Sequence, residues 1–314
     1  PALSRRDGRQ ASLEVDAMTA RMTISRRLRA ALTAAAAALL LVGCAHGRQD
    51  QGTYASAGDP GQGSIVLGAD SSAESRVVAA LYEQLLTAAG KKVQAATASY
   101  ATAEDSAKAV GAGRLTLTPA YETALLRAFP GGQNLPGNMT ATLSMALPMG
   151  IDALPPAAAQ RGVVLTVSRA TARRYGLHCL ADLAKTHGRL TLGGSAAGDL
   201  DAPSVKSLAK TNRVALTAAG TSDSADVRVL RSTDPVIARK GLVVLIDPKG
   251  VIPPEHVFPL INSDYADKAT RTSLARLNTV LTTDQLASLV SAVSGGENPA
   301  QAATAWLHAK GFLH

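Results

Sequence analysis

Short apolar runs alternate with helix-like patterns along most of this chain, and this alternation narrows the possible folds more than any other feature. Residues 64–69 form a short, β-branched run of the kind found in buried parallel strands. Ser71 and Glu74 then predict a capping box, apolar residues follow at helical spacing, and Gly90 ends the helix. Similar apolar runs recur at 93–98, 115–117, 163–167, 190–192, 227–230 and 242–246. Such a chain is predicted to be an α/β protein built on mainly parallel sheets.

The last part of the chain is predicted to be helical. Leu274, Leu277 and Leu281 lie at helical spacing, and a second such pattern runs over 286–293. Asn298 followed by Pro299 is a typical helix start, because asparagine caps the first turn and proline fits the first helical position. We therefore expect helices to follow the last strand.

We expect the first 43 residues to be an over-extended N-terminus followed by an export signal. Residues 1–17 are polar, and a basic stretch, an apolar run over 30–40 and the tetrapeptide Leu41-Val42-Gly43-Cys44 follow. A cysteine in this setting resembles the lipobox of bacterial lipoproteins, in which the thiol is acylated and the leader is removed. A transmembrane anchor is the alternative, but an apolar run of about 13 residues is shorter than the roughly 20 that a helical span needs. We expect a lipidated Cys44 that holds the protein at the extracytoplasmic face of the cell membrane.

Charge and cysteine content exclude several classes of function. Without residues 1–44 the chain has 25 basic and 21 acidic residues, so the net charge falls from +8 to +4. No cluster of basic residues with interleaved aromatics remains, and we expect no nucleic-acid partner. Cys179 is then the single remaining cysteine, which leaves neither a disulfide framework nor a metal-binding CxxC spacing. We expect no metal and no cofactor.

Catalytic motifs are equally sparse. The segment Gly193-Gly194-Ser195-Ala196-Ala197 has the strand-to-turn setting of a nucleophile elbow, but it ends in alanine instead of glycine. The histidines are scattered, and His178 and His187 lack metal-ligand spacing. No phosphate-binding loop follows a predicted strand. We therefore expect a protein that is not an enzyme.

Several segments match one protein family in order and spacing. They are residues 65–69, 113–121, 175–177, 190–194, 232–237, 241–247 and 310–313. The most specific is Ser232-Thr233-Asp234-Pro235-Val236-Ile237, which leads to the apolar run 241–247. Together they resemble the substrate-binding proteins of osmoprotectant ABC importers, the glycine betaine/choline/carnitine-binding family, over most of residues 64–313. The resemblance implies a two-lobed type II periplasmic-binding fold, in which each lobe is a mainly parallel sheet flanked by helices.

The resemblance also implies that the chain crosses twice between the lobes. We place the crossings near 145–160 and 230–240, so that lobe I comprises 64–150 and 236–314 and lobe II comprises 151–235. Residues 44–63 contain glycine, serine, aspartate and proline without an apolar period, and we expect a flexible tether. The implied partners are a small-molecule solute and an ABC permease in the membrane, and the implied state is a monomer that captures the solute by lobe closure.

Ligands of α/β folds lie beyond the carboxyl ends of the parallel strands, beside helix N-termini. The turns at this edge and the resemblance together provide the candidate ligand-binding residues. They are Asp70, Ser71, Ser72, Tyr121, Glu122, Gly194, Ser195, Arg231, Thr233, Asp234 and Glu255.

The ligand pocket implied by the resemblance is divergent. The family holds a quaternary ammonium in a box of aromatic rings, and Tyr121 matches one box position. Ser72, Arg231 and Glu255 stand where relatives often have aromatic residues, and Asp70 stands where a lysine that meets the ligand carboxylate is common. Two interpretations remain. Either the ligand is a cationic or polyhydroxylated solute, or the pocket is vestigial and the lipoprotein acts as an interaction or sensor partner without transport.

Overall fold

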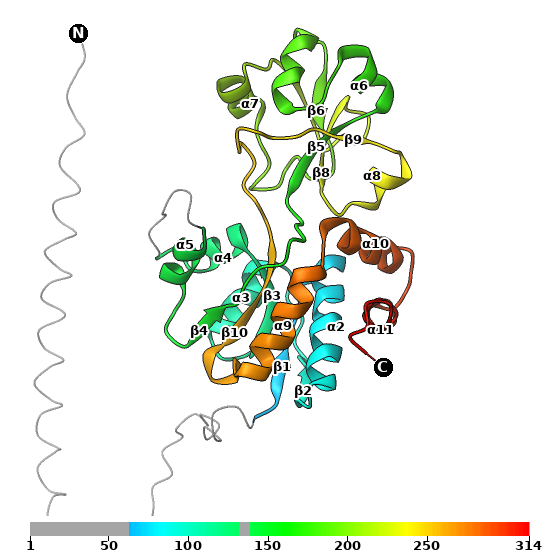
Figure 1. The fold of residues 1–314 in the computed structure, drawn as a ribbon. Helices are drawn as coiled ribbons and strands as arrows, with labels where there is room; N and C mark the ends of the chain where they lie inside the picture. The colour runs from blue at the N-terminus through cyan, green and yellow to red at the C-terminus, as the bar shows by residue number, and fades with distance from the viewer. Residues whose placement is uncertain (1–62, 132–138, 314) are drawn as a thin grey trace, which may run out of the picture. The chain divides into compact units, whose positions relative to one another are not determined.

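The computed structural model describes residues 63–131 and 139–313, which fall in one structural unit that spans 57–314. The export signal, Cys44 and nearly all of the predicted tether lie outside the described residues, so lipidation stays a prediction. None of the described helices is both long and apolar enough to cross a bilayer. The described strands form two five-stranded sheets (Figure 1).

The first sheet has the strand order β2-β1-β3-β10-β4. Its strands are β1 (Ile65–Leu67), β2 (Val93–Ala95), β3 (Leu117–Tyr121), β4 (Ile151–Ala153) and β10 (Val257–Asn262). β1 pairs in parallel with β2 and β3, whereas β10 pairs antiparallel with β3 and β4. In this sheet four strands therefore run in one direction and β10 runs in the other.

The second sheet repeats this pattern with the order β7-β6-β8-β5-β9. Its strands are β5 (Val163–Val167), β6 (Thr191–Gly193), β7 (Thr217–Gly220), β8 (Val227–Arg231) and β9 (Val243–Val244). β6 pairs in parallel with β7 and β8, and β5 pairs antiparallel with β8 and β9. The prediction of two mainly parallel sheets is confirmed.

The chain passes between the two sheets twice. Each time it enters the new sheet through the strand that runs antiparallel to its neighbours. The chain leaves β4 and enters β5 through residues 154–162, and it leaves β9 and enters β10 through residues 245–256. The boundaries drawn from the sequence, 150/151 and 235/236, place β4 in lobe II and β9 in lobe I, whereas β4 pairs with β10 of the first sheet and β9 pairs with β5 of the second. With three residues, β4 is too short to show a strand period in the sequence, whereas β9 lies within the predicted strand 242–246.

Helices bury both faces of the first sheet. Around it lie α2 (Ala73–Ala88), α3 (Ala103–Gly111), α4 (Glu122–Ala128), α5 (Met139–Ala146), η2 (Ser263–Tyr265), α9 (Lys268–Val280), α10 (Thr283–Ser294) and α11 (Pro299–Ala309). Successive side chains of a strand point to opposite faces. Accordingly, Ile65 and Leu67 pack in a core with residues of α2, α9, α10 and α11, whereas Val66 packs against a second core that includes residues of α3, α4 and α5.

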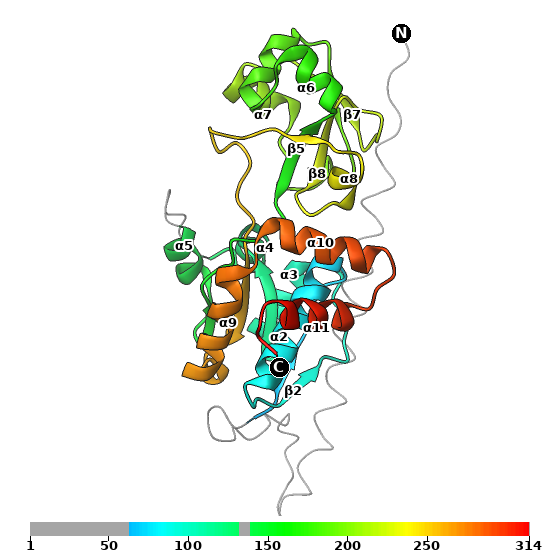
Figure 2. The same cartoon turned by 45° about the vertical axis from the view of Figure 1, so that its right-hand side comes forward.

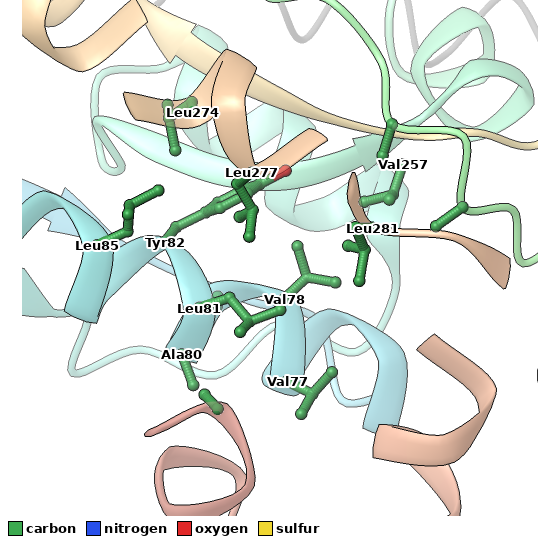
Figure 3. Close-up of a cluster of buried hydrophobic side chains, with 14 of the residues drawn as sticks. Val77, Val78, Ala80, Leu81, Tyr82, Leu85, Val257, Leu274, Leu277 and Leu281 are labelled. Carbon is green, nitrogen blue, oxygen red and sulfur yellow. The ribbon is translucent and has the colours of Figure 1, made fainter. Parts of the chain in front are cut away.

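Apolar side chains of α2 form the centre of the first core. Val78 and Leu81 of α2 and Leu277 of α9 are fully buried, and Figure 3 shows the Tyr82 side chain of α2 directed toward Leu277. Burying each such side chain contributes about 1.5–3 kcal/mol relative to leaving it in water. α11 lies beside α2 (Figure 2), and the Gln84 side-chain amide of α2 donates to the Ala300 carbonyl oxygen at 2.7 Å.

The helix starts expected from the sequence had different outcomes. The start of α11 is confirmed, because Asn298 Oδ1 accepts from the Ala300 N–H at 2.8 Å and Pro299 is the first helical residue. The capping box of Ser71 and Glu74 is wrong. Ser72 caps α2, with its Oγ accepting from the Ser75 N–H at 3.2 Å.

The second sheet has its own core. Its helices are α6 (Arg169–Tyr175), the 3-10 helix η1 (Leu180–Thr186), α7 (Val205–Asn212) and α8 (Pro235–Arg239). Leu165, Leu180 and Leu208 are fully buried in this core. Cys179 directly precedes η1 as a half-buried free thiol.

Candidate functional site

Four separate chain segments meet at one edge of the first sheet. The carboxyl ends of β1 and β3 lie at the same edge as the amino end of β10, because β10 runs antiparallel to β3. Asp70 follows β1, Tyr121 ends β3, and Glu255 precedes β10. Arg161 joins them from the crossing segment between β4 and β5, where its N–H donates to the Glu255 carbonyl oxygen at 3.0 Å. We call this cluster the edge site, and it consists of Asp70, Ser72, Glu74, Tyr121, Glu122, Arg161 and Glu255.

The Arg161 guanidinium covers the ring of Tyr121. The guanidinium carbon lies 3.9 Å from the ring centroid, which is well within the range of a cation–π contact. The ring is fully buried, and the Arg161 side chain is 16% exposed. Burial raises the pKa of the Tyr121 phenol, so the hydroxyl stays neutral. The single predicted box residue therefore already has a cation on its face.

Acidic side chains outnumber the basic ones in the edge site. Asp70 Oδ2 lies 3.9 Å from Arg161 Nη1, and Glu74 and Glu255 also act electrostatically on the guanidinium. Asp70 and Glu255 are 3% and 1% exposed, so little solvent screens their charges. One guanidinium thus faces several carboxylates, and the site has an excess of negative charge.

Several buried polar atoms of the edge site have no hydrogen-bond partner among the described residues. They are Asp70 Oδ2, Tyr121 Oη, Glu122 Oε2 and Arg161 Nε. Most buried polar side-chain atoms of native proteins make at least one hydrogen bond. These acceptors and donors, which lie in one cluster, are therefore suited to hydrogen-bond a small polar molecule.

Glu255 has an unusual protonation equilibrium. Its Oε1 accepts from the Thr123 N–H at 2.8 Å and also from the Thr123 hydroxyl. Burial raises the pKa of Glu255 to about 7, the Thr123 N–H lowers it, and the neighbouring Glu122 raises it. The charge of the edge site therefore changes near neutral pH.

Glu122 is paired with a histidine that the sequence analysis did not select. Its Oε1 lies 2.8 Å from His256 Nδ1. This hydrogen bond raises the pKa of His256, against a smaller opposing effect of burial. Glu122 itself is 3% exposed and begins α4 directly after Tyr121. The pair thus ties the amino end of α4 to the amino end of β10.

The guanidinium of the predicted residue Arg231, at the end of β8, is paired with the carboxylates of Asp199 and Asp201. Its Nη1 and Nη2 donate to the two carboxylate oxygens of Asp201 at 2.8 and 3.2 Å. Nη2 also lies 2.5 Å from Asp199 Oδ2. With its guanidinium in a two-point contact and a third ion pair, Arg231 has little left to offer a ligand carboxylate.

The remaining predicted residues of the second sheet have structural partners. Thr233 is fully buried, and its hydroxyl donates to Glu74 Oε1 at 2.5 Å, which links the end of β8 to α2. Asp234 caps α8 by accepting from the Val236 N–H at 2.9 Å. Ser195 is exposed, and its hydroxyl lies 3.5 Å from Asp234 Oδ2.

Gly194 and the serines after β1 complete the predicted set. Gly194 has φ +128°, and a Cβ there would lie 2.5 Å from the Val229 carbonyl oxygen, so the close approach to β8 requires glycine. The Ser71 hydroxyl donates to the Ala101 carbonyl oxygen at 2.8 Å. Ser72, besides capping α2, accepts from Arg161 Nη1 at 3.4 Å. A solute-binding role for any of these residues stays a prediction.

Residues 63–131 and 139–313 contain no group of three or more histidine, cysteine, aspartate or glutamate side chains suited to hold a metal ion. Within the same residues no histidine hydrogen-bonds the Ser195 hydroxyl.

Sequence reasoning missed Arg161, Glu74, His256, Asp199 and Asp201. Glu74 was interpreted as a capping residue, although its carboxylate accepts from Thr233. Arg161 lies one residue beyond the predicted crossing and just before a strongly apolar strand. The one sequence signal that could have identified Arg161 was a charged residue between a predicted crossing and a buried strand.

Comparison with known proteins places the chain among solute-binding proteins. A family model described as the substrate-binding domain of ABC-type glycine betaine transport systems, OpuAC, matches residues 63–309. No curated protein matches the chain.

Solved structures show the same fold. A glycine betaine/carnitine/choline ABC transporter structure matches with a TM-score of 0.70 at 19% identity, over 80% of this chain and 99% of the other. Apo YehZ from Escherichia coli matches with a TM-score of 0.63 at 19% identity, over 79% and 99%. Lactococcal OpuAC in its closed form with glycine betaine matches with a TM-score of 0.50 at 15% identity, over 79% and 97%. The predicted two-lobed type II periplasmic-binding fold is confirmed.

Proposed function

Because the chain belongs to the family of substrate-binding domains of ABC-type glycine betaine transport systems, we propose that it is the solute receptor of an ABC importer, with a cationic solute as its ligand. Proteins of this family bind solutes for transporters and are not an enzyme family. The proposed solute is small and polar, of the quaternary-ammonium or osmoprotectant type. Acyl chains on Cys44 would hold the receptor at the extracytoplasmic face of the cell membrane, next to its permease.

The excess of carboxylates in the edge site supports a cationic ligand. Asp70, Glu122 and Glu255 are nearly fully buried there, and Arg161 is the one guanidinium among them. A solute with its own carboxylate would meet like charges, since Arg231 is already bound to Asp199 and Asp201. Burying a charge without a counter-charge is costly. A cation without a carboxylate therefore fits better than a betaine.

Capture would occur by closure of the two lobes and involves no covalent step. The crossing segments 154–162 and 245–256 are the connections about which the lobes would move. A ligand drives such a change only through contacts that differ between the open and closed states. The second-sheet groups Ser195, Thr233 and Asp234 are the proposed source of those contacts, because they follow strands at the carboxyl edge of that sheet.

Titration calorimetry and thermal melts with choline and glycine betaine test this function. We expect choline to raise the melting temperature of the full chain, since a ligand of the native state stabilises it, and we expect betaine to bind more weakly. Asp70→Asn should weaken choline binding about tenfold, because it removes a buried counter-charge. Asp264→Asn changes an exposed aspartate of η2 and serves as the matched control.

Betaine binding tighter than about 10 µM, with Asp70→Asn harmless, would overturn the proposed ligand class. Absence of any small-molecule shift, together with a stable protein partner, would favour the interaction or sensor function instead. Lipidation has a separate test, in which labelled palmitate should be incorporated into the wild-type chain and not into Cys44→Ser.

A further inference from the structure

The contacts of Arg161 differ from those of an arginine that holds a fold together. Arg231 makes the usual two-point contact with a carboxylate, at 2.8 and 3.2 Å. The Arg161 guanidinium instead lies 3.9 Å from Asp70 Oδ2 and 3.4 Å from Ser72 Oγ, and its Nε has no hydrogen-bond partner among the described residues. The guanidinium carbon also lies over a ring face, at 3.9 Å from the Tyr121 centroid. The guanidinium is thus held by a π face and surrounding negative charge.

A ring face surrounded by negative charge is also a favourable environment for a free cation. Ring faces attract cations most strongly when both are removed from water, and Tyr121 is fully buried. The three other cation–ring pairs among the described residues are wider, at 5.2, 5.4 and 5.8 Å. Arg161 is anchored through its backbone N–H, which donates to the Glu255 carbonyl oxygen, whereas its side chain makes one long hydrogen bond, at 3.4 Å to Ser72 Oγ. The side chain can therefore leave without breaking a fork-like ion pair.

We propose that the Arg161 guanidinium is a tethered cation that occupies a guanidinium-binding site on the Tyr121 ring and competes there with solute cations. The site binds planar or quaternary cations, and in the absence of solute its occupant is Arg161 of the same chain. Arg161 thereby sets a threshold for solute binding, since any cation that uses the ring must first displace it. This inference concerns the resting occupant of the ring and goes beyond the proposed transport function.

Chemical rescue of Arg161→Ala tests the proposal in the full chain. Removing the side chain vacates the ring face and leaves the carboxylates unbalanced, so we expect a lowered melting temperature. Millimolar guanidinium chloride should then raise that temperature in a saturable way relative to sodium chloride of equal ionic strength. In the wild type guanidinium should produce no rise, because the site is already filled.

Two further variants identify the ring face as the site. The double variant Arg161→Ala/Tyr121→Leu should lose the rescue. Arg174→Ala, which removes the exposed cation of a 5.2 Å pair with Tyr175, should show none. Tetramethylammonium should bind Arg161→Ala about 30-fold more tightly than the wild type, the factor that matches a desolvated cation–π contact of about 2 kcal/mol.

A native-like circular dichroism spectrum of Arg161→Ala without guanidinium rescue would overturn the proposal. If that variant does not fold, nuclear magnetic resonance of arginine-labelled wild type decides. The Arg161 side-chain signals should carry a ring-current shift that Tyr121→Leu abolishes, and signals without such a shift would refute the arrangement. Rescue in a chain whose wild type binds no solute would support this inference and remove the proposed function. Solute binding by the wild type, without guanidinium rescue of Arg161→Ala, would support the proposed function and refute this inference.

Discussion

Replacing Glu255 with glutamine should remove a pH-dependent loss of stability that the edge site imposes on the fold. Burial raises the pKa of Glu255 from 4.5 to about 7, so the folded chain keeps a proton on this carboxyl after the unfolded chain has lost it. The stability from this group is therefore fully present below about pH 4.5 and is lost as the pH rises to about 7. That interval corresponds to about 3 kcal/mol of unfolding free energy.

Glutamine has the shape of the protonated acid, and its side-chain oxygen can still accept from the Thr123 N–H and hydroxyl. The charges that face Glu255 are those of Glu122, Arg161 and Asp201, and the substitution leaves all of them in place. We therefore expect Glu255→Gln to be nearly neutral at about pH 4 and to exceed the wild type by about 3 kcal/mol at about pH 8.

Urea denaturation followed by circular dichroism, at constant ionic strength between about pH 4 and pH 8, measures this difference. The raised pKa of His256, which follows from its hydrogen bond to Glu122, also lowers stability as the pH rises through that pKa. This effect of His256 is present in both the wild type and Glu255→Gln, so it largely cancels in the difference between their unfolding free energies. Glu297→Gln changes an exposed glutamate after α10 and is the control. A difference for Glu255→Gln that does not change with pH would refute the reasoning.

Two predictions concern the cores of the two sheets. Leu277→Ala should destabilise the chain by about 2–5 kcal/mol in urea denaturation, because it opens a cavity against α2. The control Val280→Ala, on the exposed side of α9, should cost far less. Equal losses of stability in the two variants would contradict the packing. Gly194→Ala should cost about 2–4 kcal/mol, since its Cβ would meet the Val229 carbonyl oxygen at 2.5 Å in a backbone of φ +128°. Gly198→Ala, where the new Cβ has open space, is the control, and a similar loss there would contradict the close approach of β6 and β8.

Local patterns of the sequence predict the fold class well. The apolar runs at 163–167 and 227–230 became the paired strands β5 and β8. The Asn298–Pro299 start also survives, because a capped first turn depends on a few neighbouring residues. The edge strands β4 and β7 and the central strand β10 were missed, whereas β9 lies within the predicted run 242–246.

The candidate site was predicted in part. Asp70, Tyr121 and Glu255 do lie together, because the carboxyl ends of parallel strands share one edge of a sheet. Arg231 was predicted only as a candidate ligand-binding residue, and in the structure it pairs with Asp199 and Asp201. Pairing between charged side chains on separate loops depends on side-chain reach in three dimensions, which no spacing in the chain expresses.

The sequence by itself determined the α/β class, the two mainly parallel sheets, the family and the edge at which polar residues collect. The α/β class and this edge follow from periodicity and turn chemistry, which act between near neighbours in the chain, whereas the two sheets and the family follow from the resemblance of whole segments. Only the tertiary structure decided that Arg161 lies on the Tyr121 ring and that Glu255 is buried enough to titrate near neutral pH. Both depend on where the crossing segments return to the first sheet, and hence on contacts between residues far apart in the chain.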